Sequence, residues 1–205
     1  MTLRVVNLGL PKTGTTTFSR ALKTAGLKTA DHRIRRYQTE NANLHGAFVA
    51  DVMYRGYFNT GDPAAEFTDF GAISEMSVLR VGRSLWPQMD FAIIDALRRL
   101  HPDLRFVATK RPVWDISQSM LGWSNLGTDR LPHSAIPGLP PGYGETSKQR
   151  ETWITAHYAH LTALLDGDQR YLELDVTRED AAEVLGAHVG MDIPWWGHVN
   201  KGRVA

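Results

Sequence analysis

The sequence predicts an α/β fold in which a parallel sheet is covered by helices on both faces. Two observations lead to this fold class. Short apolar runs alternate along the chain with stretches whose apolar residues recur at helical spacing. The length of 205 residues suits one domain, and 42% hydrophobic with 22% charged residues is typical of a globular protein that buries its own core. We therefore expect residues 1–205 to form a single domain.

The first half of the chain carries three clear patterns. Residues 3–10 are apolar and rich in β-branched residues, which predicts a buried strand. Residues 15–25 have apolar side chains at helical spacing and end at Gly26, which predicts a helix, and residues 27–32 predict a second strand. Residues 43–57 are weakly helical, whereas residues 58–81 contain Gly and Pro and show no regular pattern.

The second half predicts a regular alternation of elements. Residues 89–100 form an amphipathic helix with four apolar residues on one face, namely Phe91, Ile94, Leu97 and Leu100. A buried strand over 104–109 follows, and Pro112 begins a helix that ends near Gly122. Residues 124–144 contain four prolines and four glycines, which predicts a long, mobile surface loop. The remaining predicted elements are a helix over 145–165, a strand over 171–176 and a helix over 178–188.

Composition excludes several classes of protein and site. The chain has no cysteine, which excludes disulfides, thiolate metal sites and cysteine nucleophiles. Its net charge of +1 provides no global field that would attract nucleic acid or anionic lipid, so any anion site must be local. Apolar runs are too short to span a bilayer, and the first residues do not resemble a signal peptide. We expect a cytoplasmic protein without a nucleic-acid or membrane partner.

The turn between the first strand and the first helix carries the strongest functional signal. Its residues are Gly9, Leu10, Pro11, Lys12, Thr13, Gly14, Thr15, Thr16 and Thr17. A glycine-containing turn at a helix N-terminus directs backbone N–H groups to one point, where an anion binds. Capping threonines in a plain turn are the alternative. The lysine within the turn, followed by a glycine and three hydroxyls, favours phosphate binding.

The spacing of this turn bears on which phosphate compound binds. Gly9 and Gly14 have the spacing of the Walker pattern G-x-x-x-x-G-K-[ST], but Thr15 stands where that pattern requires lysine. The lysine here is Lys12, two residues before the second glycine. A P-loop kinase of a small molecule or nucleotide is therefore the alternative hypothesis rather than the first.

Residues 11–16, with the sequence PKTGTT, resemble the 5′-phosphosulfate loop of the sulfotransferase family, whose members carry P-K-[ST]-G-T-T after their first strand. The resemblance implies a P-loop-type three-layer fold and the sulfate donor 3′-phosphoadenosine 5′-phosphosulfate, with 3′-phosphoadenosine 5′-phosphate as product. It implies transfer of a sulfuryl group to a hydroxyl or amine of a small-molecule or carbohydrate acceptor. The residues it assigns to the donor are Pro11, Lys12, Thr13, Gly14, Thr15, Thr16 and Thr17.

A second motif of the family is an arginine at a strand end, followed eight residues later by a serine. Here the strand over 104–109 leads to Arg111, and Ser119 follows within the next helix. The resemblance implies that both contact the 3′-phosphate of the donor. Pro112 lies one residue earlier than in most members. The alternative is an ordinary surface arginine and helix serine.

A third resemblance lies at the C-terminus, where the family closes the 3′-phosphate site with a late loop containing Lys-Gly. The chain has Lys201, Gly202 and Arg203 there, and Trp195 and Trp196 before them could anchor the tail. The two cations would add positive charge, and the glycine would let the backbone approach the phosphate. A frayed basic tail is the alternative.

Sulfuryl transfer needs a group that stabilises the leaving oxygen and a base for the acceptor. Lys12 lies where charge grows on the leaving phosphate, and no metal is expected. A base must be His, Glu or Asp. Asp31 and His32 follow the second strand, near where carbohydrate and tyrosine sulfotransferases place an acidic base. Turn and surface roles are their alternatives, and other candidates for the base are His45, Asp51 and Asp90.

Three further histidines, His133, His157 and His160, are expected to be structural, because no carboxylate pattern typical of a metal site accompanies them. Residues 33–88 and 124–144 match no motif, and we expect them to recognise the acceptor. A nucleotide-binding module without catalysis is a third hypothesis.

Overall fold

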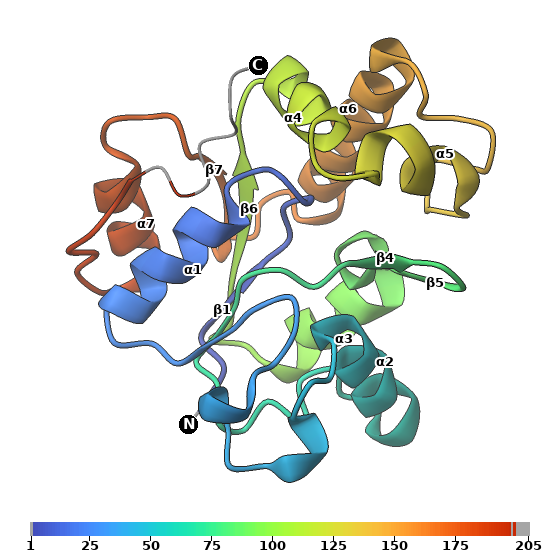
Figure 1. Ribbon diagram of the computed structural model, residues 1–205. Coiled ribbons are helices and arrows are strands. Elements are labelled where there is room, and N and C mark those ends of the chain that lie inside the picture. The colour runs from blue at the N-terminus through green and yellow to red at the C-terminus, as the bar shows by residue number, and fades with distance from the viewer. Residues whose placement is uncertain (1, 198, 200–205) are drawn as a thin grey trace.

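A five-stranded parallel sheet runs through the centre of the computed structural model, which describes residues 2–197 and residue 199 (Figure 1). Its strands lie in the order β2-β3-β1-β6-β7, and every neighbouring pair is parallel. Their bounds are β1 (Val5–Asn7), β2 (Thr29–Ala30), β3 (Ala72–Ile73), β6 (Arg105–Lys110) and β7 (Tyr171–Asp175). The predicted α/β class with a parallel sheet is confirmed.

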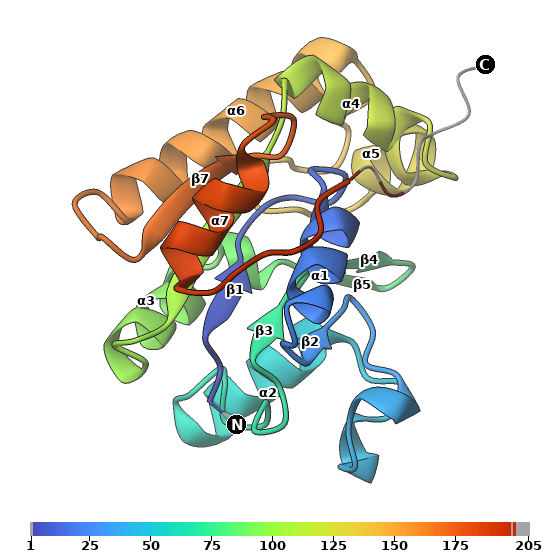
Figure 2. The same cartoon turned by 90° about the vertical axis from the view of Figure 1, so that its left-hand side faces the viewer.

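Helices cover both faces of this sheet, as predicted. Val5 and Val107 pack against α1 (Thr15–Thr24) and α7 (Ala181–Val189), which lie side by side in front of the sheet in Figure 2. Val6 and Phe106, the next residues in register, point to the other face. There they pack against α2 (Val49–Thr60), α3 (Phe91–Leu100) and the end of α6 (Ser147–Leu164). Alternation along strands that are apolar on both faces therefore produces a three-layer arrangement.

A third apolar cluster corrects the prediction for residues 124–144, which are not a mobile surface loop. They contain the π-helical turn η4 (Leu126–Arg130) and the short helix α5 (Leu131–His133). Four of their apolar side chains are buried against α6 and α4 (Val113–Leu121), namely Leu126, Leu131, Ile136 and Leu139. The segment is folded despite its prolines and glycines, because burial of the apolar side chains between them stabilises it.

Several element bounds also differ from those predicted. The weakly helical stretch 43–57 divides into the 3-10 turn η2 (Ala42–Leu44) and α2, which begins six residues later than expected. The unpatterned residues 58–81 contain β3 and β4 (Val78–Arg80). Two further 3-10 turns, η1 (Arg36–Gln38) and η3 (Pro87–Met89), follow β2 and precede α3, respectively. In α3, Phe91 and Leu100 at the helix ends are exposed, and Ile93 and Ala96 are buried instead.

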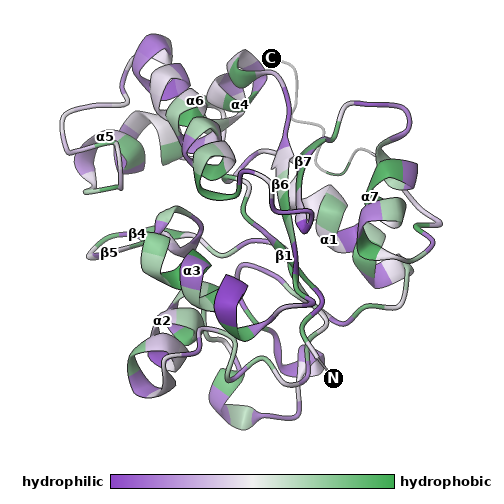
Figure 3. Ribbon diagram, turned by 180° about the vertical axis from the view of Figure 1, so that it is seen from behind, coloured by the Kyte–Doolittle hydropathy of each residue, from purple (hydrophilic) through white to green (hydrophobic). Residues whose placement is uncertain are grey.

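A two-stranded antiparallel hairpin of β4 and β5 (Arg83–Leu85) projects from the body of the molecule (Figures 1 and 3). Helices around the body carry both hydrophobic and hydrophilic residues along their length (Figure 3). Within residues 2–197 and 199, no helix combines the length and the hydropathy that crossing a bilayer requires.

The order of the strands determines where a ligand can bind. β1 lies between β3 and β6, and the connection after β1 leads to β2 on one side, whereas the connection after β6 leads to β7 on the other. Where two neighbouring connections diverge in this way, a crevice forms beyond the carboxyl ends of the strands. The β1–α1 turn and Arg111 both lie at this point.

His157 of α6 forms a hydrogen bond with the backbone just after β1. It is buried, and its Nε2 lies 2.9 Å from the carbonyl oxygen of Leu8. Because a carbonyl only accepts, Nε2 carries the proton. Nδ1 is buried, and no hydrogen-bond partner for it exists among the described residues. Burial lowers the pKa of His157 to about 4.

We expect His157 to make the fold acid-sensitive. Its pKa falls from 6.5 in the unfolded chain to about 4 in the native protein, so the unfolded chain binds more protons between these values. The free energy of unfolding should therefore fall by about 3 kcal/mol as the pH drops from 7 to below 4. Urea unfolding of His157→Gln, whose amide can donate to Leu8, should show a smaller loss. His133→Gln, at an exposed histidine, is the control, and equal losses in both variants would contradict this role.

Candidate functional site

The β1–α1 loop, residues 8–14, passes directly over the end of β6. A Cβ built on Gly9 would lie 2.6 Å from the carbonyl oxygen of Thr109 and closer still to its hydroxyl, so only glycine fits. The Gly9 N–H donates to Asn7 Oδ1 (2.9 Å), which also accepts from the Thr109 N–H (3.1 Å). The Thr13 hydroxyl donates to Leu10 O (2.7 Å) and lies 2.8 Å from that of Thr109. Buried hydrogen bonds therefore fix the course of the loop.

The backbone of this loop has left-handed residues just before the start of α1. Gly14 is the N-cap residue with φ 104°, and it provides no side-chain hydrogen bond to the first turn. Lys12 also has a positive φ of 72°, which is uncommon for a residue with a side chain. A helix N-terminus without a capping side chain, preceded by left-handed residues, is suited to bind an anion.

Lys12 adds a full positive charge to this loop. Its Nζ lies 3.5 Å from the centre of the Trp123 ring, in a cation–π contact. Burial lowers the pKa of Lys12, the nearby Arg111 lowers it further, and the carboxylate of Glu75 opposes this effect. The ammonium group is thus half-buried beside a second cation.

Arg111 follows β6 directly, at the predicted position. Its Nε donates to the carbonyl oxygen of Lys12 (3.0 Å), and Nη2 donates to that of Asp115 (3.3 Å). Burial lowers the pKa of this guanidinium group. The two cations predicted to bind phosphate, which are 99 residues apart in the sequence, therefore lie together.

Ser119 lies in α4, as predicted, and is half-buried. Ser117, two residues earlier, faces the core, where its hydroxyl accepts a hydrogen bond from Arg150 Nε (3.1 Å). Two residues rotate a helix by about 200°, so Ser119 lies on the side of α4 away from Arg150. No hydrogen bond joins Ser119 to Arg111 among the described residues.

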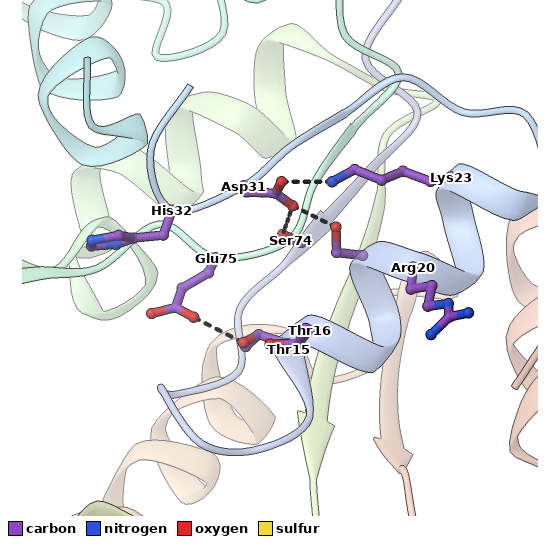
Figure 4. A pocket seen from close by; sticks show the side chains of 9 residues that line it. Thr15, Thr16, Arg20, Lys23, Asp31, His32, Ser74 and Glu75 are labelled. Carbon is purple, nitrogen blue, oxygen red and sulfur yellow. Dashed lines mark hydrogen bonds and ion pairs between the residues drawn. The ribbon is translucent and has the colours of Figure 1, made fainter. Parts of the chain in front are cut away.

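A cavity of about 340 Å³ lies beside the first turns of α1 (Figure 4). The residues that line it all have a polar or charged group: Thr15, Thr16, Ser19, Arg20, Lys23, Asp31, His32, Ser74 and Glu75. Both predicted bases, Asp31 and His32, are among these residues. The cavity begins at Thr15, the first residue of α1, so it adjoins the loop.

Asp31 is held by several donors. Its carboxylate accepts from the Ser19 hydroxyl (2.5 Å) and forms an ion pair with Lys23 (2.6 Å), both on α1 (Figure 4). The amide of Gln38 and the hydroxyl of Ser74 each lie 3.4 Å from it. Asp31 therefore ties α1 to the segments after β2 and β3, an arrangement typical of a group that positions others.

His32 is oriented differently. Its Nδ1 lies 2.8 Å from the carbonyl oxygen of Ser77, and its ring packs against Phe48 with the centroids 5.1 Å apart. Because the carbonyl only accepts, Nδ1 carries the proton. In the neutral ring Nε2 then keeps its lone pair and can accept a proton.

Sequence analysis missed two residues at this site. Glu75 follows β3 and accepts a hydrogen bond from the Thr15 hydroxyl (2.8 Å). Trp123 follows α4 and covers Lys12. The apolar pair Ala72–Ile73 before Glu75 was a weak signal for a strand end, but two residues cannot be recognised as a strand from pattern alone. For Trp123 the sequence held no such signal.

The C-terminal segment returns to the start of α1. The Thr17 hydroxyl donates to the carbonyl oxygen of Gly197 (2.9 Å), and the Arg20 guanidinium lies 4.3 Å from the Trp195 ring centre. Trp196 Nε1 donates to Val176 O (3.4 Å). Trp195 and Trp196 therefore both contact the body of the molecule. The predicted phosphate contacts Lys201, Gly202 and Arg203 lie outside the described residues.

Comparison with known proteins adds no assignment. No protein-family model matches the chain, and a search among curated proteins returns no match. Function is therefore inferred from the chemistry of the β1–α1 loop, Arg111 and the adjoining cavity.

Proposed function

We propose that the chain is a P-loop-type sulfotransferase, which moves a sulfuryl group from 3′-phosphoadenosine 5′-phosphosulfate to a hydroxyl or amine of an acceptor. The observation that carries this proposal is the pair of half-buried cations, Lys12 and Arg111, beside the uncapped N-terminus of α1. Arg111 lowers the pKa of Lys12, so the two groups repel each other. An anion with several charges, bound beside both, would relieve that repulsion.

The residues of the loop fit the proposed donor. N–H groups of residues 13–17 would hold the 5′-phosphate side, aided by Pro11, which shapes the turn, and by the hydroxyls of the threonines. Arg111 and Ser119 would hold the 3′-phosphate. The contribution expected from Lys201, Gly202 and Arg203 stays a prediction, because these residues are outside the described part of the chain.

The bound donor supplies an electrophilic sulfur with a phosphate leaving group. As the sulfur–oxygen bond breaks, charge grows on that phosphate, and Lys12 with the loop N–H groups stabilises it. Lys12 Nζ contacts the Trp123 ring in this structure. We infer that Lys12 leaves this contact for the stronger attraction of the leaving oxygen.

Of the two predicted bases, His32 is the better candidate. Its Nε2 has a lone pair while the Ser77 carbonyl fixes the ring. The oxygens of Asp31 are occupied by donors from α1, so we assign it the role of holding α1 beside the cavity. The acceptor hydroxyl would lose its proton to His32 Nε2 as it attacks the sulfur.

A P-loop kinase is the second candidate, and one observation favours it. The Glu75 carboxylate, which accepts a hydrogen bond from Thr15 at the start of α1, lies beside the loop, where it could serve as one of the groups that hold Mg²⁺ in metal-dependent phosphoryl transfer. Against a kinase, Thr15 stands where a Walker lysine is required, and Lys12 approaches from within the turn.

The nucleotide preference tests the first candidate directly. We expect 3′-phosphoadenosine 5′-phosphate to bind far more tightly than ADP in calorimetry. Arg111→Ala should cost more than about 1.5 kcal/mol of that binding and little of the ADP binding, because a charge-assisted hydrogen bond to the 3′-phosphate is lost. Equal losses for both nucleotides would show that Arg111 does not recognise the 3′-phosphate.

The role of Lys12 should appear in turnover more than in affinity. Lys12→Ala should lower kcat by on the order of 10²–10³, because the charge it stabilises grows only in the transition state. Binding of the product nucleotide should weaken less, since backbone N–H groups still hold the 5′-phosphate. Lys12→Arg should rescue kcat in part. Steady-state kinetics at saturating donor, with acceptors identified by a mass-spectrometric screen, measure this, and an unchanged kcat would refute the mechanism.

Metal removal separates the two candidates. We expect sulfuryl transfer to persist in excess EDTA, because the proposed stabilising groups are Lys12 and backbone N–H groups. The measurement compares the rate of product formation before and after chelation. Loss of activity in EDTA, with recovery on addition of Mg²⁺, would instead favour the kinase and its Thr15–Glu75 pair.

A further inference from the structure

Two arginines, Arg33 and Arg80, contact the same aromatic ring as His32, which lines the cavity. The proposed sulfuryl transfer does not use them. The His32 ring, which lines the cavity, packs against the ring of Phe48. The guanidinium carbons of Arg33 and Arg80 lie 5.4 Å and 5.1 Å from the centre of the same Phe48 ring. The proposed base and two cations are thus arranged around one aromatic side chain.

These cations are concentrated without matching acids. Arg80 stands directly opposite Arg83 across the β4–β5 hairpin, and Arg83 pairs with Asp51 (3.0 Å). Arg130 Nη1 donates to Leu79 O (2.9 Å), beside Arg80. In the described part of the chain, no ion pair joins Arg33, Arg80 or Arg130 to a carboxylate. Like charges placed opposite each other in a hairpin are destabilising.

The charges within the cavity itself are balanced. Two cations, Arg20 and Lys23, face two carboxylates, Asp31 and Glu75, and Lys23 is paired with Asp31. The surplus positive charge therefore belongs to the arginines beside Phe48. It lies next to the base rather than next to the β1–α1 loop.

Arg33 and Arg80 are both exposed to solvent, and each contacts the body of the molecule. Arg33 Nε donates to the carbonyl oxygen of Gly46 (2.7 Å), which leaves its terminal nitrogens to contact a ligand. The Arg80 guanidinium contacts the face of Phe48 as well. A guanidinium group that contacts an aromatic ring keeps N–H donors that match the two oxygens of a carboxylate or phosphate.

We propose that Arg33 and Arg80 bind an anionic oxyacid group of the acceptor, a carboxylate or a phosphate, and so present a neighbouring hydroxyl to His32. This inference rests on the proposed function, and it names the acceptor as a small, acid-bearing hydroxyl compound. Arg130 adds positive potential behind Arg80. Neutral phenols and neutral sugars would lack the group that these arginines bind.

Calorimetry at low ionic strength tests the site with three probes: glucose 6-phosphate, glucuronate and glucose. We expect either or both anions to bind at least 10-fold more tightly than neutral glucose, and the comparison of the two anions distinguishes a phosphate from a carboxylate. Arg80→Gln should weaken binding of the preferred anion by about 10-fold, the scale for one charge-assisted hydrogen bond. Arg33→Lys keeps the positive charge but loses the paired N–H donors of the guanidinium group, so it should weaken binding of the preferred anion by a smaller factor.

Two further variants make the result specific. Arg99→Gln is the matched control, because Arg99 is an exposed arginine paired with Asp95 on α3, and it should leave binding unchanged. Arg111→Ala reports on an anion bound at the β1–α1 loop instead. The proposal is overturned if no probe binds, if glucose binds as well as both anions, or if binding depends on Arg111 and not on Arg80. Thermal unfolding of each variant confirms that it is folded.

These measurements need no donor nucleotide, so they separate this inference from the proposed function. Anion binding that depends on Arg80, in a chain that does not prefer 3′-phosphoadenosine 5′-phosphate to ADP, would leave the arginine site standing and remove the sulfotransferase. A clear preference for 3′-phosphoadenosine 5′-phosphate without anion binding at Arg80 would support the sulfotransferase and overturn the arginine site.

Discussion

The close crossing of the β1–α1 loop over the end of β6 is the constraint on which the site depends. Only glycine fits at position 9, because Thr109 occupies the space where the Cβ of any other residue would lie. Asn7, at the end of β1, accepts hydrogen bonds from the Gly9 and Thr109 N–H groups and so joins the two strand ends. Because this contact fixes the loop against β6, the residue that follows β6, Arg111, lies within hydrogen-bond distance of the Lys12 backbone. The parallel pairing of β1 with β6 thus brings together Lys12 and Arg111, which are 99 residues apart in the sequence.

Bringing these cations together has an electrostatic cost, and the surrounding residues offset only part of it. Lys12 and Arg111 repel each other in a half-buried position, and Lys12 adopts a left-handed backbone conformation. Glu75 and the Trp123 ring counteract the repulsion on Lys12. Strain and unbalanced charge of this kind persist where the rest of the fold determines the geometry, and they are common at functional sites. The proposed anionic donor would remove the imbalance.

The sequence predicted those parts of the fold and site that depend on local pattern. Helices such as α1 and α3, and the strand β6, have enough residues for their pattern of apolar residues to appear. The strand β2 lies within the predicted strand 27–32, whereas β3 has only two residues and is a strand because it pairs with β1 and β2. The place of the β1–α1 loop between a strand and a helix was predictable because its residues are contiguous. Glu75 and Trp123 were not, since their places at the site depend on tertiary contacts that no local pattern encodes.

The connection between β3 and β4, residues 74–77, links the β1–α1 loop to His32 and the β4–β5 hairpin. Glu75 accepts a hydrogen bond from Thr15 at the start of α1, Ser74 lies near the Asp31 carboxylate, and the Ser77 carbonyl fixes the ring of His32. The same connection then leads into the hairpin that carries Arg80. A shift of this segment would change the position of the proposed base and of the loop together. Residues 74–77 lie in a region without a regular sequence pattern, yet their hydrogen bonds hold the start of α1, Asp31 and His32 in fixed relative positions.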